Sequence, residues 1–65
     1  MKPILFKAKC IDSRYGYEDF FGKTIYGYGI EQIIMRGELL ECRLRERYSQ
    51  NLMVVDPSTL VMTTL

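Results

Sequence analysis

Residues 23–48 have the sequence KTIYGYGIEQIIMRGELLECRLRERY, and the fold of the chain depends on how this segment is built. In its first half, Tyr26, Tyr28 and Ile30 alternate with two glycines. Glycines inside a strand pattern often mark a bulge or the close approach of another backbone. Arg36-Gly37 is a turn signal between two apolar segments. We therefore expect one long hairpin that turns at Arg36-Gly37.

The second half of this segment fits two interpretations. As a strand, it alternates apolar and charged residues and places Leu40, Cys42 and Leu44 on one face. As a helix, it aligns Leu40, Leu44 and Tyr48, which recur every four residues, and Leu, Glu and Arg favour helices. We favour the strand over residues 38–48, because it completes the hairpin.

The segment before the hairpin predicts a strand and a loop. Residues 4–11 alternate apolar residues with Lys7 and Lys9, which is typical of a half-buried strand, and Pro3 suits its first position. The apolar side is expected to hold Ile4, Phe6, Ala8 and Cys10. Residues 15–22 mix aromatics, glycines and acids, which fits a loop folded onto the core or a ragged strand pair.

The segment after the hairpin predicts a short buried strand, a helical turn and a last extended stretch. Residues 52–55 are apolar and partly β-branched. Asp56 can cap a helical turn and Pro57 suits the first helical position, so we expect one short turn near residues 56–60. Residues 60–65 are expected to be extended. The predicted fold is a single small domain over residues 1–65: mostly β, with a strongly bent antiparallel sheet or partly open barrel of four to five strands.

Composition argues against catalysis. The chain has 65 residues, and the absence of histidine removes the commonest general base and all His-ligated metal sites. Two cysteines cannot build a Cys-only zinc site within one chain. The glycines at 27 and 29 lack the third glycine of a dinucleotide loop. We therefore expect no enzymatic activity, no cofactor and no metal site.

Size and cysteine usage bear on compartment and assembly. No apolar run is long enough for a signal peptide or a membrane span, so we expect a cytoplasmic protein in which Cys10 and Cys42 are buried free thiols. A core this small rarely supplies more than about 3–5 kcal/mol of stability. With neither a disulfide framework nor a metal, self-association is the remaining way to add stability, and we expect at least a dimer.

Tyrosines and arginines are the candidate binding residues. Tyr, Arg and Met are enriched in protein interfaces. A net charge of +1 provides little electrostatic attraction for a polyanion. Two alternatives stay open: an oligomeric binder of a signalling nucleotide, and a small barrel that binds single-stranded nucleic acid. The candidate residues are Arg43, Arg45 and Arg47, which share one face of a strand, and Tyr15, Tyr17, Tyr26 and Tyr28.

Three segments resemble the phage and prophage YopX family. ILFKAK at residues 4–9, with Asp12 after it, resembles the opening strand of that family. IYGYGI at residues 25–30 resembles its aromatic-Val-Tyr-Gly-Tyr strand, and VVDPSTL at residues 54–60 resembles its Val-Asp-Pro-Ser/Glu-Thr-Val segment. Thr-Thr-Leu at residues 63–65 stands where the family continues toward Thr-Gly-Leu.

The chain also departs from the family pattern. Thr24 stands where the family has an aromatic residue, and Val61-Met62 where it usually has Gly-Gln. Family members continue into a second β-rich half, so the chain resembles the N-terminal half of the family only. The resemblance implies a small β-rich fold and a phage setting, and it carries over no catalytic residues. We therefore expect a phage-encoded accessory protein that binds and interferes with a host or defence component through its Tyr/Arg surface, with no membrane partner.

Overall fold

The computed structural model describes residues 4–64 and is mostly β, with strands joined by turns and loops and one 3-10 helix. The expected strand start at Pro3 and the extended end at Leu65 lie outside the described residues. The elements follow one another as β1 (Ile4–Lys9), β2 (Thr24–Met35), β3 (Glu38–Glu46), β4 (Leu52–Val55), the 3-10 helix η1 (Pro57–Thr59) and β5 (Val61–Thr64).

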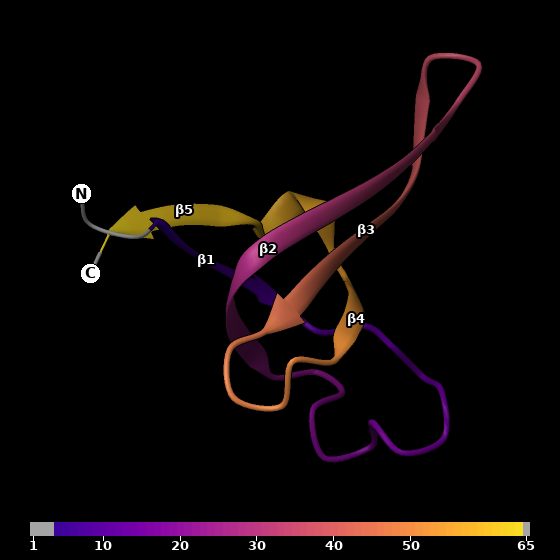
Figure 1. The fold of residues 1–65 in the computed structure, drawn as a ribbon. Helices are drawn as coiled ribbons and strands as arrows, with labels where there is room; N and C mark the ends of the chain where they lie inside the picture. The colour runs from indigo at the N-terminus through magenta and orange to yellow at the C-terminus, as the bar shows by residue number, and fades with distance from the viewer. Residues whose placement is uncertain (1–3, 65) are drawn as a thin grey trace.

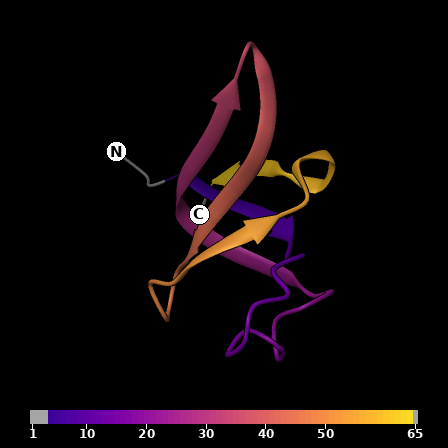
Figure 2. The same ribbon diagram turned by 90° about the vertical axis from the view of Figure 1, so that its right-hand side faces the viewer.

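The strands form one bent antiparallel sheet in the order β4-β3-β2-β1-β5 (Figures 1 and 2). The bend brings β4 back to the end of β1, where Cys10 and Val55 form a single bridge. Beside this bridge, the Ile11 N–H donates to the Val54 carbonyl. Within residues 4–64 the sheet does not close. The prediction of a mostly β, strongly bent sheet is therefore confirmed.

The central hairpin forms as expected from the sequence. Residues 38–46 are a strand and not a helix, and the strand ends two residues before the expected residue 48, where a turn begins. Arg36 and Gly37 both have positive φ, 53° and 79°, which is the backbone geometry of the tight turns that suit the twist of paired strands. Beyond the reach of β1 and β4, the end of the hairpin projects from the rest of the sheet as an arm (Figure 1).

Gly27 marks a close backbone approach, as its strand context predicts. The register of β2 on β3 shifts between Gly27 and Gly29, which is a β-bulge at Tyr28. A Cβ atom on Gly27 would lie 1.8 Å from the Arg45 carbonyl oxygen. Only glycine fits at this position of the bulge.

The core lies on the concave side of the sheet. Its buried residues come from four strands and the end of β1: Ala8, Cys10, Ile25, Cys42, Leu44, Met53 and Val55. Tyr17 and Phe20 pack against them from the loop before β2, so the segment 15–22 is a loop folded onto the core and not a strand pair.

Two residues expected on the buried face are exposed. Leu40 is 56% exposed, because β4 pairs with β3 only at residues 42–45 and nothing covers the arm beyond. Ile4 is 45% exposed, because it lies at the outer end of β1, past the core cluster. The predicted alternation holds at Ala8, Cys10, Cys42 and Leu44. At the start of β1 it is wrong, because Leu5 is buried and Ile4 is exposed.

The helical turn near residue 56 is confirmed as η1. Asp56 caps it by accepting a hydrogen bond from the Ser58 N–H, and Pro57 takes the first position. The Thr59 hydroxyl accepts a hydrogen bond from the Lys9 N–H at 2.8 Å, which fixes the turn against β1. No helix in the described part of the chain is long and apolar enough to cross a membrane.

Both thiols should react slowly in the native protein. Cys10 and Cys42 are free and buried, and burial raises the pKa of the Cys42 thiol, which disfavours the reactive thiolate. If labelling requires opening of a domain stabilised by about 3 kcal/mol, it should be about 100-fold slower than in the unfolded chain. Timed labelling with a chromogenic disulfide reagent, with and without urea, measures this ratio. Rapid native labelling of either cysteine would contradict the strand phases.

Candidate functional site

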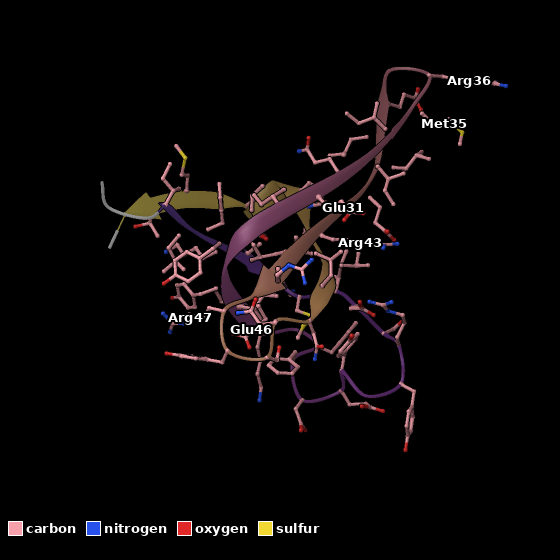
Figure 3. The ribbon with its side chains drawn as sticks, viewed as in Figure 1. Glu31, Met35, Arg36, Arg43, Glu46 and Arg47 are labelled. Atoms are coloured by element: carbon pink, nitrogen blue, oxygen red, sulfur yellow. The ribbon has the colours of Figure 1, made fainter. Side chains whose placement is uncertain are left out.

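The predicted arginines take different partners, although they alternate along one segment. Arg43 and Arg45 point outward from β3, between the buried side chains of Cys42, Leu44 and Glu46. Arg47 lies just after the strand, in the connection to β4. Figure 3 shows Arg43 beside the base of the arm and Arg47 on the opposite side of the view. The three arginines therefore belong to different surroundings.

The arm is the most exposed apolar feature of the fold. We define it as residues 33–41, which pair only with one another across the hairpin. Ile34 and Met35 are 60% and 59% exposed, and Leu39 and Leu40 are also exposed. Figure 3 shows Met35 and Arg36 at the tip, far from the core. The register of the two strands shifts between Ile33 and Ile34, within the arm. Such apolar side chains on a hairpin form a surface that a partner can cover.

Charged residues surround a shallow pocket at the base of the arm. Arg43 forms an ion pair with Glu41 of the arm. Opposite them, Asp12 and Arg14 of the loop after β1 line the same pocket, whose volume is about 290 Å³. Arg14 also lies over the ring of Tyr17, at 5.0 Å from its centroid. The predicted residue Arg43 thus lines the pocket at the arm base, and Arg14 connects this pocket to the predicted residue Tyr17.

Asp12 holds this loop in place. Its carboxylate is buried and accepts hydrogen bonds from the Arg14 guanidinium and from the Val54 N–H, at 2.7 Å and 3.1 Å. Arg14 also donates to the Leu52 carbonyl at 3.0 Å. The hydrogen bonds from Arg14 outweigh the effect of burial and lower the pKa of Asp12 to about 2. Asp12 and Arg14 thus clamp the loop to β4.

Arg47 lies between two tyrosine rings on the other side of the molecule. Its guanidinium carbon is 5.1 Å from the Tyr26 ring centroid and 4.6 Å from that of Tyr48. The Arg47 Nε is buried without a hydrogen-bond partner among the described residues. These side chains, with Lys23 and Phe20, line a hollow of about 310 Å³, which we call the stack hollow.

Glu46 holds in place the turn that carries Arg47 and Tyr48. Its buried carboxylate accepts hydrogen bonds from the N–H groups of Tyr48 and Ser49, at 3.1 Å and 2.8 Å. Burial alone raises the pKa of Glu46, but these hydrogen bonds outweigh it and the pKa is lowered. The carboxylate thereby fixes the connection that carries Arg47 and Tyr48.

A second hollow adjoins the stack hollow. It has a volume of about 440 Å³, and we call it the lysine hollow. Its lining includes Lys7 and Lys9 of β1, while Thr24 and Tyr26 line both hollows. The pairing of Lys7 with Tyr26 and of Lys9 with Thr24 across β1 and β2 explains this arrangement. No carboxylate of the described residues lines the lysine hollow.

No family model, curated protein or solved structure matches this chain.

The remaining predicted residues line neither the pocket at the arm base nor the stack hollow. Tyr15 is almost fully exposed in the loop before β2, and Tyr28 lies at the bulge. Arg45 is exposed and donates to the Gln50 carbonyl. Among the predicted residues, the structure therefore brings together Arg47 with Tyr26. Arg43 lines the pocket at the arm base, and Tyr17 contacts Arg14 of the same pocket.

Sequence reasoning did not select the arm or the lysines. The two lysines alternate outward in the sequence, but only the register of β1 against β2 places them beside Tyr26. The exposure of the arm depends on how far β4 reaches along β3. Within the described residues, no three Cys, Asp or Glu side chains gather in a group that could hold a metal ion.

Proposed function

We propose that this protein is a non-catalytic, phage-encoded accessory protein that docks on a protein of the bacterial host or of its defence system, in the host cytoplasm. The phage setting rests on the resemblance of three segments to the YopX family. Docking rests on one observation, the exposed apolar arm. Ile34, Met35, Leu39 and Leu40 are all exposed on a hairpin end that no other strand of the described chain covers.

The chemistry of the arm suggests what kind of surface it fits. Branched and sulfur-containing side chains at its end suit an apolar groove, because Met adapts its shape to irregular surfaces. Glu38 and Glu41 add carboxylates, and Arg36 at the tip is the arm's cation. Arg43 at the arm base, and Tyr17 next to Arg14 of the same pocket, add residue types that carry binding energy in protein interfaces. A partner with an apolar groove and a basic rim matches this surface.

Removing apolar contacts from the arm should abolish docking without unfolding the domain. In Ile34→Ser/Leu40→Ser, two exposed side chains change, so the melting temperature should change little. If both side chains are buried in a complex, each loss should weaken binding at least tenfold, because burying such a side chain contributes about 1.5–3 kcal/mol. Cross-linking from a photoreactive residue at position 35, in bacterial cells, should yield one defined partner that the double variant loses.

A matched control separates this effect from general loss of apolar surface. Val61 and Met62 on β5 are also exposed, so Val61→Ser/Met62→Ser should keep the cross-link.

Light scattering of the same proteins should give at least a dimer at micromolar concentration for the native chain and for both variants. An arm variant that becomes monomeric would mean that the arm binds a second copy of the chain, which would contradict docking on a host protein.

A further inference from the structure

The lysine hollow and the stack hollow together form a continuous concave surface with an excess of cations. They share Thr24 and Tyr26, and their linings contribute four cations: Lys7, Lys9, Lys23 and Arg47. Two carboxylates, Asp19 and Glu46, line the stack hollow only. The Glu46 carboxylate already accepts two backbone N–H groups. For a chain with a net charge of +1, this is a local concentration of positive charge.

These cations are not neutralised within the protein. In the described part of the chain, the side chains of Lys7, Lys9, Lys23 and Arg47 form no ion pair. Asp56, near Lys9, is occupied by the N–H and hydroxyl of Ser58. Two of the other arginines differ, since Arg14 and Arg43 are paired with carboxylates. An anion entering the lysine hollow therefore meets cations that are not held in ion pairs within the described residues, with Asp56 near Lys9 as the neighbouring carboxylate.

An aromatic platform borders the cations. Arg47 contacts one face of Tyr48, whose residue is 80% exposed. A tyrosine ring held by a guanidinium in this way can stack a heterocyclic base. Tyr26 forms the wall between the platform and the lysines. A ligand with an aromatic ring at one end and phosphates at the other fits this arrangement.

We propose that the two hollows bind a small phosphate-bearing ligand of the nucleotide class, with its base on Tyr48 and its phosphates at Lys7 and Lys9. The combined hollows have the size of small-molecule sites, which are about 300–1,000 Å³. A nucleic-acid strand is disfavoured by the small net charge of the chain, because strand binding depends on many phosphate contacts. The proposal concerns a different surface from the arm and does not depend on docking.

Binding can be measured directly on the native protein with ADP as the probe. The chain contains no tryptophan, so its fluorescence is that of five tyrosines, of which Tyr48 and Tyr26 line the stack hollow, and the signal is corrected for the absorbance of adenine. ADP should quench this fluorescence with a saturable isotherm. Lys7→Gln/Lys9→Gln should weaken ADP binding at least tenfold, and Tyr48→Ala should also weaken it when binding is followed by calorimetry. Arg36→Gln, which removes an exposed arginine at the arm tip, is the matched control and should bind ADP like the native chain.

Three further ligands identify what is recognised. Adenosine and pyrophosphate, each carrying half of the contacts, should bind more weakly than ADP. A twelve-nucleotide oligothymidine that binds more tightly than ADP would identify a nucleic-acid surface and overturn the proposal. The absence of saturable ADP binding at millimolar concentration would overturn it too, as would an equal loss in Arg36→Gln. The arm variant Ile34→Ser/Leu40→Ser should keep ADP binding, so failure of docking and failure of this site are distinguishable.

Discussion

Replacing Gly27 with alanine should leave the protein largely unfolded at 25 °C. The new Cβ atom would lie 1.8 Å from the Arg45 carbonyl oxygen and 2.7 Å from the Arg45 carbonyl carbon. Both are backbone atoms of β3, so relief requires the two central strands to separate at the bulge. Overpacking with backbone shifts costs about 1–3 kcal/mol and in some cases more. Because this clash is with backbone atoms that cannot turn away, we expect a cost above about 3 kcal/mol, comparable to the whole stability of about 3–5 kcal/mol that a core of this size supplies.

Gly29→Ala is the matched control for this prediction. It makes the same chemical change two residues along β2, where the new Cβ would lie 3.8 Å from the Arg45 Cβ, an ordinary contact. Urea unfolding followed by circular dichroism should give a native-like midpoint for Gly29→Ala and little or no folded baseline for Gly27→Ala. A Gly27→Ala protein as stable as Gly29→Ala would show that the strands do not approach each other at the bulge as described.

After Gly27→Ala, loss of the Asp12 carboxylate should have the second largest effect on the free energy of unfolding. With a pKa of about 2 in the folded protein against 3.8 for the ordinary group, ionised Asp12 contributes about 2 kcal/mol to the free energy of unfolding. This contribution is fully present above about pH 4 and is lost as the pH falls toward 2. Asp12→Asn removes the charge that holds Arg14, and should lower the free energy of unfolding at pH 7 by about 2–3 kcal/mol.

The pH profile separates this role from a general loss of packing. Native protein should lose stability between about pH 4 and pH 2, and Asp12→Asn should lose much less over the same interval because it has no carboxyl at position 12 to take up a proton. Asp19→Asn, an exposed position in the same loop, should keep the native profile. Urea midpoints measured across this pH range provide the comparison. Parallel profiles for native protein and Asp12→Asn would contradict the role of the clamp.

The local patterns of the sequence predict the strands well. Apolar alternation gives the phase of β3 at Cys42 and Leu44 and that of the end of β1 at Ala8, and the turn residues Arg36-Gly37 give the hairpin. The glycines of β2 predict a bulge, and Asp56-Pro57 predicts the capped turn. Each of these features depends on residues close together in the chain, so propensity and periodicity are enough to find them.

The arm and the two hollows depend on where the strands end and in which register they pair. Hydrophobic periodicity gives no information on either. Leu40 has the alternation of a buried residue, yet it is exposed because β4 is short. Lys7 meets Tyr26 through strand register, and Tyr26 meets Arg47 across the sheet. In the sequence, Asp12 cannot be told from an ordinary loop residue. Its role comes from Val54, far along the chain, whose N–H donates to its carboxylate. Such contacts between distant residues were beyond the reach of sequence patterns.

The position of β1 also sets a condition on the order of folding. This strand is made first, yet it takes β2 on one side and β5 on the other, and its end bonds to β4. Leu5 pairs with Thr63, so the two ends of the described chain must meet before the edge of β1 is covered. Pairings across such sequence distances slow folding. During synthesis, the hairpin of β2 and β3 can form early. One edge of β1 stays unpaired until β5 has been made and can pair with it.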